Sequence, residues 1–145
     1  MGVNPLEVTL TDFIKPCSRL TDYIKVYDDV CDKDFCEQII NSFETEEEHQ
    51  VFIDRLQRPT FTEMNISQQY MNNNHTWTAI QKQAQSVFVE YVSKYMDELD
   101  LGPDFPAKYA FEEFRVKKYR EDSNDQFSDH TDVGDYNSAR RFLVC

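Results

Sequence analysis

The chain has 145 residues, and its 27 acidic side chains against 15 Lys or Arg give a formal charge of −12 at neutral pH. This length suits one domain with a core of its own. The acidic excess argues against nucleic acid and anionic membranes as partners, because both attract basic patches. It would suit a basic partner, although a solvated acidic surface is the commoner cause of such a charge.

The cysteine content and the apolar segments also limit the class of protein. Four cysteines show neither the paired spacing of a zinc site nor a disulfide framework: Cys17, Cys31, Cys36 and Cys145. This composition predicts an intracellular, cytoplasmic protein with reduced thiols. No apolar segment approaches eighteen residues, so the sequence predicts no membrane span.

The N-terminal part gives three expectations in chain order. Residues 1–22 are expected to be an extended leader, and residues 23–30 a short strand. Asp32 then provides an N-cap for a helix to Glu44, in which apolar residues recur every three or four positions. Residues 51–70 show no clear pattern.

The clearest predicted element is a long helix between Trp77 and Leu99. Its apolar residues step by three and four and form a broad stripe, which we expect to pack against a sheet as core. Either Asn74 or Thr76 would cap its N-terminus, and the pair Gly102-Pro103 would end it.

The remaining sequence alternates between strand and turn signals. Residues 111–119 are rich in aromatic and branched side chains and predict a strand, and residues 120–126 are polar and predict a turn. We expect a strand through residues 127–132, a second turn at 133–138, and the start of an apolar strand at 140–145. This order is typical of an antiparallel barrel or jelly roll.

His130 and Asp132 are the candidate site residues with the clearest chemistry. They lie two positions apart, so on a strand both side chains would leave the same face. An imidazole and a carboxylate on one face supply two thirds of the 2-His-1-carboxylate site of non-haem iron. The alternative is a surface histidine hydrogen-bonded to a neighbouring aspartate. None of the thirteen residues after Asp132 is His.

Residues 111–145 resemble the iron(II)- and 2-oxoglutarate-dependent dioxygenases, in particular the prolyl 4-hydroxylase-like branch. That branch has a strand ending in Tyr, a short loop, an aromatic residue three positions before His-x-Asp, and an Arg opening the next strand. The residues here that fall in those places are Tyr119, Phe127, His130, Asp132 and Arg141. Residues 24–40 are also similar to the segment that opens these domains.

The resemblance implies a reaction and roles for four residues. His130 and Asp132 would bind iron(II), Tyr119 would hydrogen-bond a carboxylate of 2-oxoglutarate, and Arg141 would lie near the substrate groove. The cofactors would be iron(II) and 2-oxoglutarate, with ascorbate as an optional reductant. The reaction would hydroxylate a prolyl or other residue of a peptide, or a small molecule, and release succinate and CO2.

The chain departs from the family pattern in two places. The loop before Phe127 lacks the usual glycines and is slightly longer, and the family's distal His and its 2-oxoglutarate-anchoring Lys or Arg are absent. We therefore expect residues 1–145 to form a single α+β domain, truncated before its C-terminal strands. Its N-terminal helices would pack on an incomplete antiparallel double-stranded β-helix, or jelly roll. The chain alone is expected not to turn over 2-oxoglutarate.

A second hypothesis of a different class stays open. The chain would then be a non-catalytic acidic interaction domain that retains half of the barrel and pairs its open sheet edge with another chain.

Overall fold

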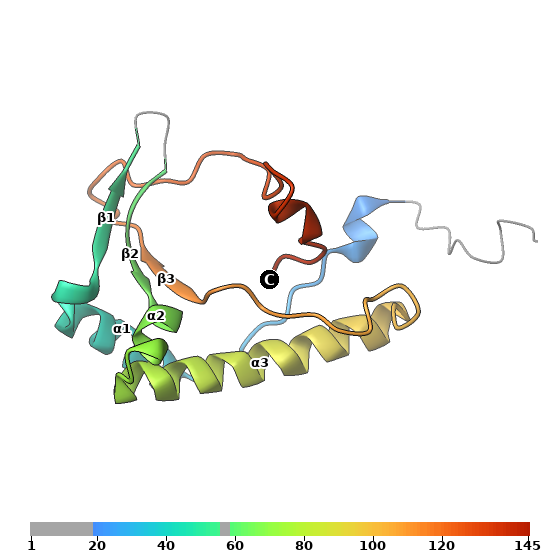
Figure 1. Cartoon of the computed structure of the whole chain (residues 1–145), viewed down its shortest axis with the longest axis horizontal. Coiled ribbons are helices and arrows are strands. Elements are labelled where there is room, and N and C mark those ends of the chain that lie inside the picture. The colour runs from blue at the N-terminus through green and yellow to red at the C-terminus, as the bar shows by residue number, and fades with distance from the viewer. Residues whose placement is uncertain (1–18, 56–58) are drawn as a thin grey trace, which may run out of the picture.

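Helices and an antiparallel sheet combine in the computed structural model, which describes residues 19–55 and 59–145 (Figure 1). The helices are α1 (Lys33–Thr45), α2 (Ile66–Met71) and α3 (His75–Leu99), and the strands are β1 (Val51–Asp54), β2 (Thr60–Asn65) and β3 (Arg115–Lys118). The described residues also include the short 3-10 helices η2 (Leu20–Tyr23), η3 (Glu47–His49) and η4 (Ser138–Arg140). This confirms the α+β class. Most of the expected leader, residues 1–18, lies outside the described part.

The cap of α1 is the predicted one. The Asp32 carboxylate accepts a hydrogen bond from the backbone N–H of Phe35 at 2.7 Å, which satisfies one of the unpaired donors of the first turn. The helix buries Phe35 and Phe43. Its apolar periodicity therefore predicted its extent and part of its core face, whereas Ile40, which fits the same periodicity, is exposed.

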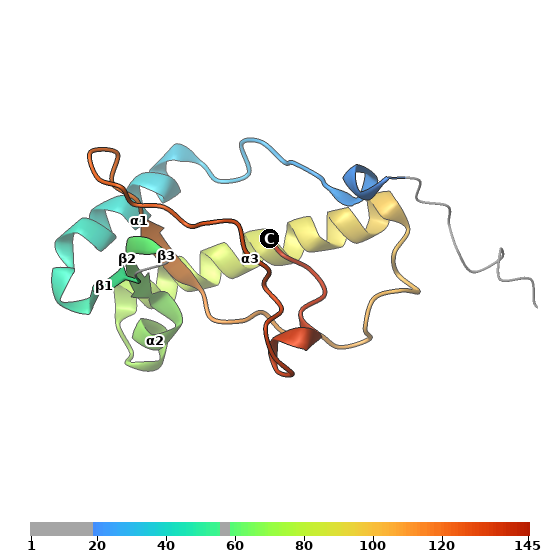
Figure 2. The ribbon, with the colours of Figure 1, turned by 90° about the horizontal axis from the view of Figure 1, so that it is seen from above.

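The strand expected at residues 23–30 is wrong. Asp29 has φ 57°, and this left-handed conformation interrupts an extended backbone. The segment lies along α3 instead (Figure 2), where the ring of Tyr27 packs 5.0 Å from that of Tyr91. The Tyr27 hydroxyl donates to Glu98 at 3.0 Å. Aromatic residues that favour a strand by propensity thus serve to attach this segment to a helix.

A hairpin of β1 and β2 occupies the region in which the sequence showed no pattern. β1 pairs with β2 antiparallel from Val51↔Glu63 to Asp54↔Thr60, and β2 pairs with β3 from Thr62↔Lys118 to Asn65↔Arg115. The sheet order is therefore β1-β2-β3. The predicted strand at 111–119 is confirmed for its last part, β3.

The first part of the α3 stripe joins the core with the sheet, as expected, through Trp77 and Ile80 beside Met64 of β2. The later part contacts the segment before α1, where Tyr91 packs on Tyr27. Of the two candidate caps, Asn74 is the one used, since its side chain accepts from the Trp77 N–H at 3.3 Å. The helix ends before Gly102, because Asp100 adopts the left-handed conformation with φ 52°. The core cluster joins three helices and the central strand: Phe35, Phe43, Met64, Ile66, Trp77 and Ile80.

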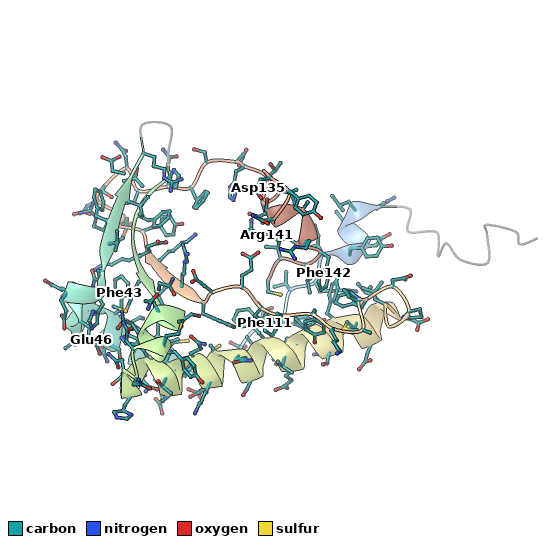
Figure 3. All side chains as sticks on the ribbon, in the orientation of Figure 1. Phe43, Glu46, Phe111, Asp135, Arg141 and Phe142 are labelled. Carbon is teal, nitrogen blue, oxygen red and sulfur yellow. The ribbon has the colours of Figure 1, made fainter. Side chains whose placement is uncertain are left out.

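Glu46 connects the end of α1 to the start of α3 (Figure 3). Its carboxylate accepts hydrogen bonds from the indole N–H of Trp77 at 3.0 Å and from the amide of Asn74 at 2.8 Å. Trp77 is fully buried, so its N–H depends on this acceptor.

The two faces of the sheet carry different side chains. Met64 and its partner Val116 belong to the core beneath the helices, and Lys118 reaches Glu44 of α1 at 2.6 Å. Because side chains alternate along a strand, Phe61 and Lys117 leave the opposite face. That second face meets the C-terminal segment.

The polar turn after β3 is confirmed. The Asp125 carboxylate is 1 % exposed and accepts from both the backbone N–H and the guanidinium Nε of Arg120, each at 3.0 Å. Gln126 forms an isolated bridge to Thr60, where strand pairing ends.

The strands expected at residues 127–132 and 140–145 are wrong. No strand lies beyond Lys118 in the described residues, and η4 occupies Ser138–Arg140 instead. Local side chains satisfy the backbone here: the carboxylate of Asp135 accepts from the Ser138 N–H at 2.8 Å, and the Ser138 hydroxyl accepts from the Gly134 N–H at 3.0 Å. Across residues 19–55 and 59–145, no helix combines the length and apolarity needed to span a membrane.

Candidate functional site

His130 and Asp132 come together although they do not lie on a strand. The imidazole Nε2 is 3.2 Å from the Asp132 carboxylate Oδ1, and the side chains are 48 % and 40 % exposed. The other ring nitrogen, Nδ1, lies 2.9 Å from the carbonyl oxygen of Ser128. In the neutral imidazole, a proton on Nδ1 would be donated to that carbonyl and would leave Nε2 with its lone pair.

With that tautomer, two electron-pair donors lie face to face, and a cation between them would stabilise the pair. With the proton on Nε2 instead, the imidazole donates directly to Asp132, which is the surface hydrogen bond of the alternative interpretation. Two adjacent ligands of an octahedral ion, with bonds of about 2.1 Å, are separated by about 3.0 Å. The observed 3.2 Å is close to that separation, so the residues fit two positions of a metal site.

A third protein ligand is not found in the described part of the chain. Among residues 19–55 and 59–145, no group of three or more His, Cys, Asp or Glu side chains is arranged to hold an ion. His130 and Asp132 are therefore a candidate pair of ligands and not a complete metal site.

An aromatic cluster supports the His130 ring. The ring centroid of Phe127 is 4.3 Å from that of His130. Phe127 stacks on Phe61 of β2 at 5.6 Å, with 15° between the ring planes. The central strand of the sheet therefore positions the histidine through two phenylalanines.

Tyr119 belongs to the same aromatic cluster. Its ring lies 5.5 Å from that of Phe61, so Phe61 contacts both Tyr119 and Phe127. Burial, and next to it the negative charge of Glu63, raise the pKa of the Tyr119 hydroxyl. The hydroxyl therefore stays protonated at neutral pH and is available as a hydrogen-bond donor.

Arg141 is engaged with the protein itself. Its guanidinium forms a two-pronged pair with Glu112, with Nε–Oε1 at 2.7 Å and the second prong at 2.8 Å. It also donates to the backbone carbonyl of Asp132. These hydrogen bonds lower the pKa of the Glu112 carboxyl. The structure thus places Arg141 beside the candidate ligand Asp132 and on the wall of a cavity.

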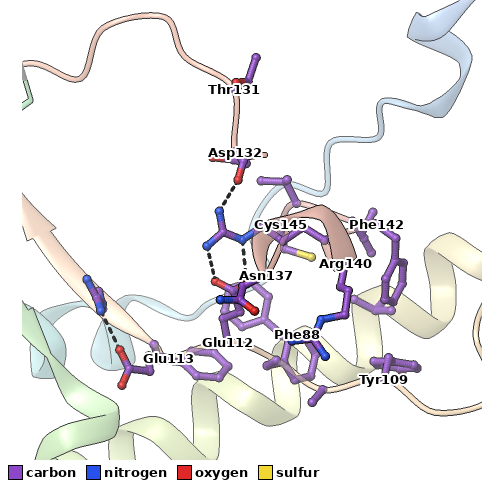
Figure 4. Close-up of a pocket in the computed structure, with 18 of the residues that line it drawn as sticks. Phe88, Tyr109, Glu112, Glu113, Thr131, Asp132, Asn137, Arg140, Phe142 and Cys145 are labelled. Carbon is purple, nitrogen blue, oxygen red and sulfur yellow. Dashed lines mark hydrogen bonds and ion pairs between the residues drawn. The ribbon is translucent and has the colours of Figure 1, made fainter. Parts of the chain in front are cut away.

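The cavity has a volume of about 1460 Å³ and lies between α3, the segment before β3 and the C-terminal segment (Figure 4). His130, Asp132 and Arg141 line it, whereas Tyr119 does not. One wall is aromatic: Phe88, Phe105, Tyr109, Phe111 and Phe142. Neighbouring rings in this wall pack edge to face, for example Phe105 on Phe142 at 5.2 Å.

The cavity differs in charge from the whole chain. Five cationic side chains line it against three acidic ones: Lys108, Arg115, Lys117, Arg140 and Arg141 against Glu112, Glu113 and Asp132. The sequence analysis missed Glu112 and Lys117. Glu112 reaches the cavity through its pair with Arg141 in the C-terminal segment, and Lys117 reaches it because of the sheet face on which it lies. The alternation around Val116 was the available signal for Lys117.

Comparisons with protein-family models, with curated proteins and with solved structures gave no match. The resemblance to the dioxygenases therefore rests on the sequence pattern of these residues alone.

Proposed function

We propose that this chain provides the metal-binding part of an iron(II)- and 2-oxoglutarate-dependent dioxygenase of the prolyl 4-hydroxylase-like kind. The observation that carries the proposal is the approach of His130 Nε2 to Asp132 Oδ1 at 3.2 Å on the wall of a large cavity. In this proposal β2 and β3 belong to the first part of a jelly roll, and the 2-oxoglutarate would enter the cavity beside them.

Each site residue has a role in this proposal. His130 and Asp132 would hold iron(II). Tyr119 does not line the cavity, so a hydrogen bond from its protonated hydroxyl to a carboxylate of 2-oxoglutarate would require the ligand to extend beyond the cavity lining. Arg141 would keep the backbone of Asp132 in place at the edge of the substrate groove. When bound, iron(II) with 2-oxoglutarate and dioxygen supplies the oxidising power for hydroxylating an unactivated C–H bond.

The substrate in this proposal is a prolyl or other residue of a peptide, or a small molecule, and ascorbate would serve as an optional reductant. The aromatic wall suits the apolar part of such a substrate. We place the activity in the cytoplasm, where thiols such as those of Cys31, Cys36 and Cys145 remain reduced; all three are free cysteines.

Metal binding tests the proposal without requiring turnover. Mn(II) would be titrated into the 145-residue chain and followed by the loss of its electron paramagnetic resonance signal. His130→Ala and Asp132→Ala should each weaken binding strongly, because two protein ligands leave no reserve. His75→Ala is the matched control, since His75 lies exposed at the start of α3. Equal binding by all four proteins would overturn the proposal.

One observation favours the second hypothesis, an interaction domain. β1 is an edge strand, and its Val51 and Phe52 are 55 % and 54 % exposed. An exposed apolar edge is a surface on which another strand can pair. This hypothesis predicts no response to Mn(II) at all, and an association that Phe52→Ser removes in a sedimentation experiment.

A further inference from the structure

Lys117 differs from its cationic neighbours because it has no carboxylate partner in the described residues. Three other cationic side chains in β3 and the turn after it each form an ion pair: Arg115 with Glu113 at 2.7 Å, Lys118 with Glu44 at 2.6 Å, and Arg120 with Asp125 at 3.0 Å. Glu63 lies directly opposite Lys117 on β2 but pairs with Arg115 at 3.5 Å, so the exposed Lys117 ammonium forms no ion pair of its own within the described part of the chain.

The ammonium of Lys117 is held close to the candidate metal pair. Its Nζ lies 4.9 Å from the ring centroid of Phe61 and 4.8 Å from that of Phe127, so it forms cation–π contacts with both rings. The Phe127 ring in turn packs on His130 at 4.3 Å. Lys117, His130 and Asp132 all line the same cavity.

The charges around Lys117 favour an anion. Two of the three acidic residues that line the cavity are engaged elsewhere, Glu112 with Arg141 and Glu113 with Arg115. The ammonium of Lys117 is exposed, so water hydrates the N–H donors that do not face the two rings. A negatively charged group of a ligand would replace that water with a charge-assisted hydrogen bond.

We propose that Lys117 binds a carboxylate of the molecule that occupies the cavity beside His130. This inference deepens the proposed function and rests on it for the position of the metal. The carboxylate would come either from the 2-keto acid or from an acidic group of the substrate. In both cases one end of the ligand lies at the His130–Asp132 pair and its negative charge lies against the Lys117 ammonium, on the side away from the rings.

Dicarboxylate binding by charge-matched variants tests this inference. Succinate, 2-oxoglutarate and a short peptide rich in Glu would be titrated by calorimetry into the full chain without metal, and into Lys117→Met, Lys117→Arg and Lys118→Met. Lys118 is the matched control, because it lies next in the strand but on the opposite face, where it pairs with Glu44. Both Met variants lose one positive charge.

The wild-type chain should bind at least one of the three ligands, and Lys117→Met should weaken that binding about tenfold or more. Lys117→Arg should retain most of it, and Lys118→Met should bind as the wild type does. Binding of 2-oxoglutarate with competition by succinate would assign the carboxylate to the 2-keto acid. Binding of the peptide alone would assign it to the substrate.

The inference is overturned if Lys117→Met binds as tightly as the wild type, if Lys118→Met weakens binding equally, or if the wild type binds none of the three. Mn(II) titration separates these failures from that of the proposed function. Mn(II) binding that depends on His130, together with no effect of Lys117→Met, would remove only the carboxylate site. Carboxylate binding through Lys117 without any Mn(II) binding would remove only the metal site.

Discussion

Arg141 and Glu112 form a two-pronged ion pair, at 2.7 and 2.8 Å, that joins the C-terminal segment to the segment before β3. The same guanidinium donates to the backbone carbonyl of Asp132. Planar, bidentate pairs of this kind fix direction as well as distance. The position of the candidate ligand Asp132 therefore depends on a residue 29 positions before Arg141 in the sequence.

Replacing Arg141 should loosen Asp132 without removing a metal ligand. We expect Arg141→Ala to weaken Mn(II) binding about tenfold, as the loss of a residue supporting a ligand usually does. Arg141→Lys should recover little, because an ammonium cannot reproduce the fork. Arg140→Ala is the control for lost charge, since Arg140 also lines the cavity. Electron paramagnetic resonance of Mn(II) measures all three. Wild-type affinity in Arg141→Ala would contradict the positioning role.

Tyr119→Phe isolates the hydroxyl, because the ring contact with Phe61 is retained. The free energy of unfolding should change by less than about 0.5 kcal/mol. Binding of 2-oxoglutarate should weaken about tenfold if the hydroxyl donates to its carboxylate. Calorimetric titration of both proteins gives the answer, and unchanged affinity would exclude Tyr119 from the binding site.

Glu46→Ala should destabilise the fold by about 1–3 kcal/mol, because it leaves the indole N–H of fully buried Trp77 without its acceptor. Urea unfolding followed by the fluorescence of Trp77, the single tryptophan of the chain, measures this loss. Glu48→Ala provides the control, because its carboxylate is largely exposed. Equal midpoints for the two variants would show that the Glu46 hydrogen bonds do not stabilise the protein.

The turn after β3 should carry an acid-sensitive contribution to stability. Hydrogen bonds from the Arg120 side chain and backbone lower the pKa of Asp125 from 3.8 to about 2. Because the folded-state pKa is the lower one, the contribution is fully present well above pH 3.8 and is lost as the pH falls through about 2.

Asp125→Asn tests this contribution. The variant should melt at a lower temperature than the wild type at pH 7, and the difference should shrink between about pH 5 and pH 2. Thermal unfolding followed by circular dichroism at several pH values measures it. A difference that stays constant down to pH 2 would contradict the assigned role of Asp125.

The sequence predicted the elements whose signal is local. The N-cap of Asp32 and the apolar stripe of α3 each follow from neighbouring residues and appear in the structure. The hairpin of β1 and β2 was not predicted, since Thr62 and Glu63 are polar residues that belong to the central strand. Their strand conformation depends on pairing on both sides, with β1 in the same hairpin and with the distant β3.

The candidate site shows the same division between local and distant information. The two-residue spacing predicted that the side chains of His130 and Asp132 lie close together, and they do. The strand that was expected to bring them together is absent, and a local bend of the chain does so instead. The tie between Arg141 and Glu112 could not be predicted, because nothing in either segment indicates the other. Lys117 was likewise missed, because it is followed by a second lysine, Lys118, and the sequence does not show which of the two faces the cavity.

The most direct test of the central claim is the location of bound Mn(II) by paramagnetic broadening in a proton–nitrogen correlation spectrum of the full chain. We predict that substoichiometric Mn(II) broadens first the signals of residues 127–132 and of Phe61, whose ring stacks on Phe127. Signals around His75, at the start of α3, should remain sharp. Broadening spread over the acidic surface, with no preference for His130 and Asp132, would contradict the metal site and the proposed function with it.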